Sequence, residues 1–171
     1  MPQGSSARIR LELPAAHADV DAIVEAAFGR ADEARLVAAL RESVEPRVSL
    51  VAEVSGHVFF SPVRIEPESA NAPAVCGLAP LAVRPGLQRQ GIGAALVREG
   101  LERCADLGWR AVFVLGDPAY YSRFGFVLAA PLGFRYESEA FDSAFQVLEL
   151  APGCLAGRAG RVHYDEAFTR L

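Results

Sequence analysis

The first part of the chain alternates between charged and apolar residues and then changes to a helical spacing. Residues 8–13 alternate in the way that a half-buried strand does. Apolar residues then recur on one face of a predicted helix from Val20 to Phe28, and Gly29 is a natural stop for it. A short second helix follows, in which Leu36 and Leu40 face inward. The pattern therefore predicts a strand followed by two helices.

The middle of the chain carries strand patterns on both sides of a tight turn. Residues 48–53 and 57–63 predict a hairpin, and residues 75–83 predict a third strand. A helix is expected from Gly91 to about Leu107. Ala111 to Leu115 is a continuous apolar run, which suits a strand that is covered on both faces.

The last part of the chain predicts a short helix over residues 119–124 and strands over residues 126–129 and 145–150. The glycine-rich tail from Pro152 onward gives no clear pattern. The whole order of elements predicts a mixed α/β sheet. Its crossover over residues 75–115 should be right-handed, with two parallel strands.

Composition narrows the class of protein. The chain has 171 residues, of which 51% are hydrophobic, so we expect one domain over residues 1–171. A net charge of −4 argues against a nucleic-acid partner. Every basic residue is an arginine, which excludes lysine chemistry such as a Schiff base or a P-loop. Without a signal-peptide pattern or a long apolar stretch, we expect a soluble, cytoplasmic protein with no membrane partner.

The cysteines and histidines form no pattern of ligands. The cysteines are odd in number, widely spaced and outside any C-x-x-C motif: Cys76, Cys104 and Cys154. This spacing argues against a disulfide framework and a zinc site, so we expect buried thiols and no metal. The histidines are scattered, and His57, next to the hairpin turn, is expected to be exposed.

The turn before the long helix has the properties of an anion site. The first turn of a helix exposes unpaired N–H groups at the positive end of the helix dipole. Gly91 and Gly93 would let an anion approach them closely, and Arg89 adds a positive charge. Residues 84–110 carry five arginines against three acids, which is the one basic stretch of the chain. These properties suit a pyrophosphate, although a plain tight turn with close helix packing is the alternative.

Two other phosphate-binding motifs fit less well. A P-loop needs a lysine, which the chain does not have, and a dinucleotide fingerprint needs a third glycine where Leu96 stands. The stretch Gln88-Arg89-Gln90-Gly91-Ile92-Gly93 resembles the Q/R-x-x-G-x-G/A motif of the GNAT acetyltransferase superfamily. Residues 120–126, a tyrosine-bearing segment that ends in Gly-Phe, are similar to the second signature of that family. The close resemblance covers residues 78–128.

The resemblance implies a fold and a cofactor. The implied fold is a mostly antiparallel central sheet with flanking helices, in which the central parallel strand pair splays apart. The implied cosubstrate is acetyl-CoA, whose pantetheine arm enters the gap, and Pro80 is compatible with a bulge there. An N–H group near Leu81 would polarise the thioester carbonyl. The residues assigned to the cofactor are Leu81, Ala82, Val83, Gln88, Arg89, Gln90, Gly91, Ile92, Gly93 and Ala94.

The resemblance also implies a catalytic residue. Tyr121 lies four residues before Gly125, where the family often places a tyrosine that protonates the departing thiolate. The alternative is that Tyr121 only packs beside Phe124 and Phe126, while Tyr120 packs or faces the substrate. The asparagine that the family commonly has after the second parallel strand is missing here, because that position reads Gly-Asp-Pro.

The general base has no clear candidate. The family often carries a glutamate on the central strand, but residues 75–83 contain no acid. The remaining candidates have the character of solvated surface acids: Glu25, Glu33, Glu53 and Asp117. The amine would otherwise arrive deprotonated or lose its proton to water.

The function implied is an N-acetyltransferase in which a primary amine attacks acetyl-CoA directly within a ternary complex. The acceptor would be a small molecule or a peptide, and its pocket is expected to include residues 15–41. A homodimer remains open. The alternatives are a non-catalytic acyl-CoA-binding module or sensor of the same fold, and an unrelated nucleotide-binding domain.

Overall fold

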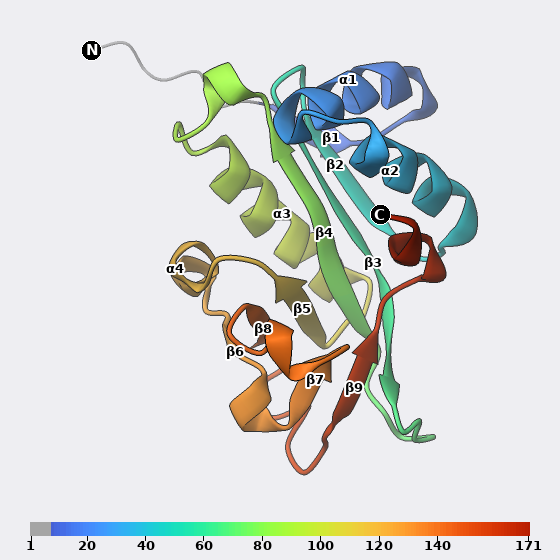
Figure 1. Ribbon diagram of the computed structural model, residues 1–171, viewed down its shortest axis with the longest axis vertical. Helices are drawn as coiled ribbons and strands as arrows, with labels where there is room; N and C mark the ends of the chain where they lie inside the picture. Colours follow the sequence, from blue (N-terminus) through green and yellow to red (C-terminus); the bar gives the residue numbers. More distant parts are fainter. Residues whose placement is uncertain (1–7) are drawn as a thin grey trace.

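The strands form a mixed sheet (Figure 1), seen in a computed structural model that describes residues 8–171. The path across the sheet runs through β1 (Ile9–Leu11), β2 (Val48–Ala52), β3 (Gly56–Glu66), β4 (Val75–Val83), β5 (Ala111–Leu115), β8 (Phe145–Glu149) and β6 (Val127–Leu128). The far end of β3 also pairs with β9 (Gly160–His163), which in turn pairs with β7 (Phe134–Tyr136).

Most neighbouring strands are antiparallel, and the central pair β4–β5 is parallel, as expected for the crossover. The connection between these two strands is α3 (Ile92–Asp106). The predicted fold class, a mostly antiparallel mixed sheet with a central parallel pair and flanking helices, is therefore confirmed. The parallel pairing of β7 with β9 was not predicted, because the tail that forms β9 has no strand pattern in the sequence.

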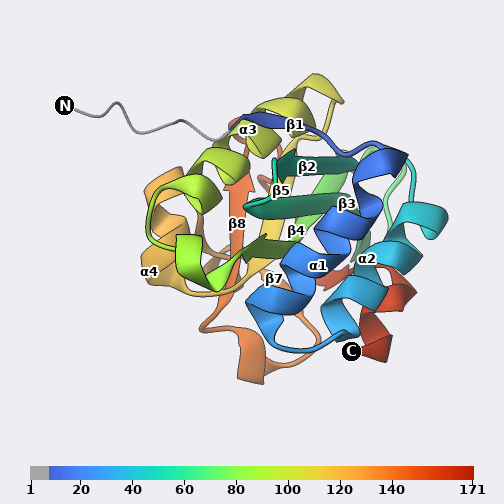
Figure 2. The same ribbon diagram turned by 90° about the horizontal axis from the view of Figure 1, so that it is seen from above.

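Helices cover both faces of the sheet (Figure 2). One face packs against α1 (His17–Phe28) and α2 (Asp32–Ser43), and the other packs against α3. The shorter helical turns are α4 (Pro118–Tyr121), η1 (Pro14–Ala16), η2 (Pro85–Leu87), η3 (Ser122–Phe124), η4 (Ala130–Leu132), η5 (Glu139–Phe141) and η6 (Glu166–Arg170).

Alternation along the strands assigns side chains to the two faces. In β2, Leu50 packs on the α3 side in one cluster with Leu96, while its neighbour Val51 packs on the other side with Ile23. All of these side chains are buried, and each contributes about 1.5–3 kcal/mol relative to exposure. A strand that is covered on both faces has mostly apolar residues along its whole length. This explains why β2 and β5 do not alternate between polar and apolar residues.

His57 differs from its expected place. The sequence predicts an exposed histidine, but His57 is fully buried in β3, and its Nε2 lies 2.8 Å from the Ser49 hydroxyl. Glu12 lies 3.7 Å from the same nitrogen and is held by Arg41 at 2.9 Å. The pKa of His57 is lowered to about 4, mainly by burial; the charge of Glu12 opposes this shift and the charge of Arg41 adds to it. The prediction was wrong because segments that are distant in sequence cover His57: α1 packs against β3, and Glu12 lies beside the imidazole ring.

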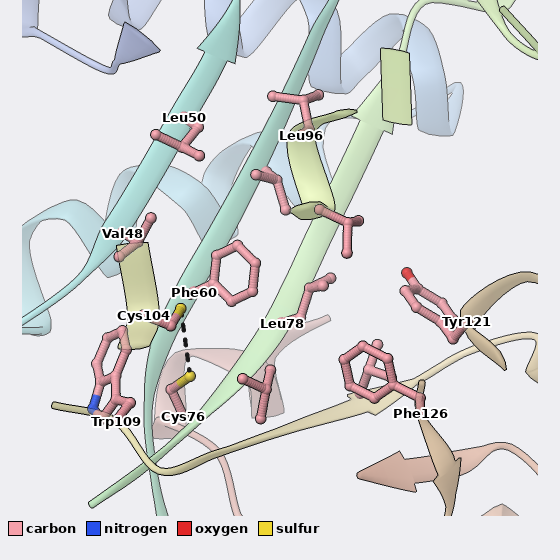
Figure 3. Packing of buried hydrophobic residues seen from close by; sticks show 14 of the residues in the cluster. Val48, Leu50, Phe60, Cys76, Leu78, Leu96, Cys104, Trp109, Tyr121 and Phe126 are labelled. Carbon is pink, nitrogen blue, oxygen red and sulfur yellow. Dashed lines mark hydrogen bonds between the residues drawn. The ribbon is translucent and has the colours of Figure 1, made fainter. Parts of the chain in front are cut away.

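Two of the three thiols are buried, as predicted. Cys76 and Cys104 pack in the cluster under α3, where their Sγ atoms are 3.8 Å apart (Figure 3). Cys154 is partly exposed.

Candidate active site

The end of β4 separates from β5. The parallel ladder runs from Val75 opposite Ala111 to Leu78 opposite Val114 and ends there. Beyond this point β4 has a β-bulge, in which Ala79 and Pro80 together lie opposite one residue of β3. Pro80 has no N–H group to donate, so a bulge suits it better than a regular ladder position. The remaining residues of β4 therefore turn backbone groups toward the gap on the β5 side.

A loop follows β4 and leads into α3. Arg89 and Gly91 both have left-handed backbone conformations, with φ of 61° and 85°. Glycine adopts this conformation freely, whereas in arginine it carries strain. Gly91 is the N-cap of α3 and has no side chain that could accept a hydrogen bond from the helix. The first N–H groups of α3 therefore remain available to a ligand. Gln88 fixes the loop by donating from Nε2 to the Val83 carbonyl oxygen at 3.1 Å.

This loop forms one wall of a cleft of about 760 Å³, called here the cofactor cleft. Eight of the ten residues assigned to the cofactor line it: Leu81, Val83, Gln88, Arg89, Gly91, Ile92, Gly93 and Ala94. Ala82 does not, because strand alternation turns its side chain into the cluster under α1 and α2. The exposed Gln90 also lies outside the lining of the cleft.

The opposite wall of the cofactor cleft comes from α4 and the turn after it. Tyr120 and Arg123 line the cleft, and the Arg123 guanidinium lies 4.4 Å from the centre of the Tyr120 ring. The Arg123 Nε also donates to the Tyr120 carbonyl oxygen at 2.9 Å. Arg123 was not predicted as a site residue from the sequence. Its position three residues after Tyr120 in a helical segment does indicate that the two side chains lie close together.

A second cavity, called here the acceptor cavity, has a volume of about 430 Å³. It shares Leu81, Asp117 and Tyr120 with the cofactor cleft, so the two spaces meet at these residues. Its further walls come from α1, α2, the end of β5, β7 and the segment around η6. The prediction that residues 15–41 help to form this pocket agrees with the presence of Phe28, Glu33 and Leu36 in its wall.

Tyr121 lines the acceptor cavity but not the cofactor cleft. Its ring packs at 5.7 Å from the ring of Phe126, and its hydroxyl points away from that residue (Figure 3). Gly116 lies against the Tyr121 ring so closely that a side chain there would displace it. Burial raises the pKa of Tyr121, and the neighbouring Tyr120 adds to the rise. The hydroxyl therefore stays protonated and able to donate at neutral pH.

Among the acids considered as bases, two line the acceptor cavity. Glu33 is buried in its wall and is not the solvated surface acid that the sequence suggested. Asp117 stands where the cavities meet, and its Oδ1 caps α4 by accepting from the Ala119 N–H at 2.9 Å. Glu25 and Glu53 are exposed and line neither space.

Residues 8–171 contain neither a cluster of metal ligands nor a helix that could span a membrane. No group of three or more histidine, cysteine, aspartate or glutamate side chains in this range is placed to hold a metal ion. No helix in the same range combines the length and apolar character that crossing a membrane requires.

The chain resembles known proteins over most of its length. Residues 45–128 match the family model of the acetyltransferase (GNAT) domain. The uncharacterized N-acetyltransferase YhbS of Escherichia coli K12 is 42% identical over 168 residues, which cover 95% of this chain and 99% of YhbS.

Two solved structures are similar in fold and in sequence. The E. coli YhbS structure in complex with CoA has a TM-score of 0.87 and 41% identity, covering 96% of this chain and 92% of its own. A GNAT family acetyltransferase from Brucella melitensis in complex with acetyl-CoA has a TM-score of 0.75 and 34% identity, covering 94% and 97%. On this evidence, the chain belongs to the GNAT family of N-acetyltransferases.

Proposed function

We propose that the protein transfers an acetyl group from acetyl-CoA to a primary amine, which attacks the thioester directly while both substrates are bound. The observation that carries this proposal is the meeting of two cavities at Leu81, Asp117 and Tyr120. One cavity has the character of a phosphate cleft, and the other is apolar. Relatives that share the fold and at least 34% of the sequence were solved with CoA or acetyl-CoA.

The cofactor cleft suits the pyrophosphate of CoA. The available N–H groups at the start of α3 and the Arg89 side chain provide donors and positive charge. Gly91 and Gly93 leave the floor of the cleft open, since neither carries a side chain. From there the pantetheine arm would follow β4 past Val83 and Leu81, and the thioester would reach the junction with the acceptor cavity. An N–H group near Leu81 would donate to the carbonyl oxygen as negative charge develops on it.

Tyr121 is the proposed acid. The amine nitrogen forms a bond to the carbonyl carbon, the carbon–sulfur bond breaks, and the sulfur takes the proton of the Tyr121 hydroxyl. The Tyr121 phenolate regains a proton from water. The amine attacks in its neutral form, and its nitrogen then releases one proton to water. Asp117 is the acid at the junction of the cavities, and it is the candidate that would accept this proton through water.

A thiol-release assay over a panel of amines tests the activity, and Tyr121→Phe tests the mechanism. We expect Tyr121→Phe to lower kcat by about 100-fold, which is the size of a general-acid contribution. The affinity for CoA, measured by calorimetry, should change by less than about threefold, because Tyr121 does not line the cofactor cleft.

Tyr136→Phe is the matched control, since Tyr136 also lines the acceptor cavity but comes from β7, whereas Tyr121 follows the junction residue Tyr120 in α4. Equal kcat in the wild type and Tyr121→Phe would remove Tyr121 from the mechanism. Tight binding of acetyl-CoA without thiol release for any amine would contradict the enzymatic proposal and favour a non-catalytic binding module.

A further inference from the structure

The walls of the acceptor cavity constrain the acceptor beyond the presence of an amine. We propose that the acceptor is an amine on an apolar body, aromatic or branched aliphatic, that carries no anionic group, and that Glu33 selects for its positive charge. This inference rests on the proposed function and names the substrate class of the same site.

Apolar and aromatic side chains form most of the cavity. Phe28, Leu36, Tyr136 and Phe168 come from four separate elements and converge on it. A volume of about 430 Å³ lies within the usual range for small-molecule sites. Such walls favour apolar surface on a ligand, because its transfer from water is favourable by roughly 25 cal/mol per Å².

The polar side chains that face a polyhydroxylated acceptor are two carboxylates and the tyrosine hydroxyls, and the other side chains of the walls are apolar. Tyr164 lines the cavity, but its hydroxyl already donates to the Phe113 carbonyl oxygen at 3.1 Å. Sugar hydroxyls buried here would lose their water without regaining equivalent hydrogen bonds, which is unfavourable. An amino sugar should therefore be a poor acceptor.

The charges that line the cavity have one sign. Glu33 and Asp117 are its acids, and neither arginine nor histidine lines it within residues 8–171. Arg30 donates from Nε to the Glu33 Oε2 at 3.0 Å, but Arg30 is 57% exposed and lies outside the lining. A ligand carboxylate or phosphate would thus face two carboxylates without a cation in the wall. An ammonium group would be attracted to the carboxylates and to the faces of the tyrosine rings.

The two acids occupy different places along the cavity. Asp117 lies at the junction with the cofactor cleft, whereas Glu33 lines only the acceptor cavity. Glu33 therefore contacts the acceptor without bordering the cofactor cleft. Its removal should weaken acceptor binding and leave the affinity for CoA unchanged.

The test compares kcat/KM values in a thiol-release assay for phenethylamine, isoamylamine, phenylalanine, glucosamine and spermidine. Phenethylamine and phenylalanine share a body and differ by one carboxylate, so their ratio isolates the charge effect. We expect the two apolar amines to exceed each of the others by at least about tenfold in kcat/KM. Spermidine should be poor because its internal ammonium group would lose its water against the apolar walls. Glu33→Gln should raise the KM for phenethylamine about tenfold with little change in kcat, and should reduce the preference over phenylalanine.

Two variants separate this effect from a general loss of structure. Glu25→Gln removes an exposed acid that lines neither cavity, and Arg30→Gln removes the ion pair while the Glu33 side chain stays in place. Both should retain the wild-type order of acceptors. CoA affinity and the thermal midpoint of each variant verify folding.

A preference for phenylalanine, glucosamine or spermidine, or an unchanged acceptor ratio in Glu33→Gln, would overturn the inference and leave the proposed function intact. Binding of acetyl-CoA without thiol release for any amine would overturn both.

Discussion

The hydroxyl of Tyr120 lies directly above Gly93, so that a Cβ on residue 93 would stand 2.8 Å from the hydroxyl oxygen. Tyr120 comes from the start of α4 and Gly93 from the first turn of α3, so this contact joins the two walls of the cofactor cleft. A side chain on residue 93 would therefore have to displace the end of the Tyr120 side chain, whereas the helical backbone of Gly93 would itself accept alanine.

Gly93→Ala should weaken CoA binding by about tenfold, because the new methyl group displaces Tyr120 and narrows the cleft. Combining it with Tyr120→Phe should recover part of the affinity, since phenylalanine lacks the hydroxyl that clashes. Calorimetric titration with CoA measures both. Gly86→Ala is the control, because a Cβ there has no atom within 4 Å. An affinity of Gly93→Ala within about twofold of the wild type would contradict the expected narrowing.

Gly91 offers a way to test whether charge governs the proposed binding of the CoA pyrophosphate at the start of α3. Gly91→Gln and Gly91→Glu both place a side chain on a residue with a φ of 85°, which costs about 1–2 kcal/mol in either variant. The glutamate alone adds negative charge beside the pyrophosphate. We expect the affinity for CoA to be about tenfold lower in Gly91→Glu than in Gly91→Gln, with the difference shrinking at high salt. Equal affinities in calorimetry would argue against a phosphate cradle at this loop.

The buried His57 should make stability depend on pH. Burial lowers the pKa of His57 from 6.5 to about 4 in the folded protein, so the unfolded chain binds more protons between these values. The folded state is therefore favoured fully above pH 6.5 and loses this contribution as the pH falls toward 4. The loss between pH 7 and pH 5 should be about 2 kcal/mol.

Glu12 acts in the same direction as His57. Burial raises the pKa of Glu12, but the hydrogen bond from Arg41 and the charges of His57, Arg41 and His17 outweigh it and lower the pKa overall. Urea denaturation at the two pH values measures the combined loss. His57→Gln should reduce the difference, and an unchanged difference in this variant would assign the pH dependence to other groups.

The packing of α3 on the sheet depends on Gly100. A Cβ on this residue would overlap the ring of the buried Phe60. Gly100→Ala should therefore destabilise the protein by about 1–3 kcal/mol despite the better helix propensity of alanine. Phe60→Leu should make room for the new methyl group, so the double variant should lose less stability than the sum of the two single variants. Urea denaturation of the four proteins of this double-mutant cycle measures the difference. Strict additivity of the two changes would show that residues 60 and 100 do not constrain each other.

The elements of the central sheet could be predicted because their signals are local. The apolar run in β5 and the turn with Gly91 before α3 each depend on neighbouring residues only. β9 could not be predicted, since it is a strand of only four residues after a glycine-rich stretch and pairs with β3 across about a hundred residues of chain. The burial of His57 was missed for the same reason, because the residues that cover it, Glu12 and those of α1, are distant in sequence.

The sequence by itself determined the order of the main elements, the glycine loop at the start of α3 and the absence of lysine chemistry. These follow from local backbone geometry and from composition. Only the tertiary structure decided that Tyr120 stands over Gly93 and that Glu33 is buried in the wall of the acceptor cavity. The physical reason is that this cavity is enclosed by side chains from distant segments of the chain, and its shape and charge exist only after those segments have packed together.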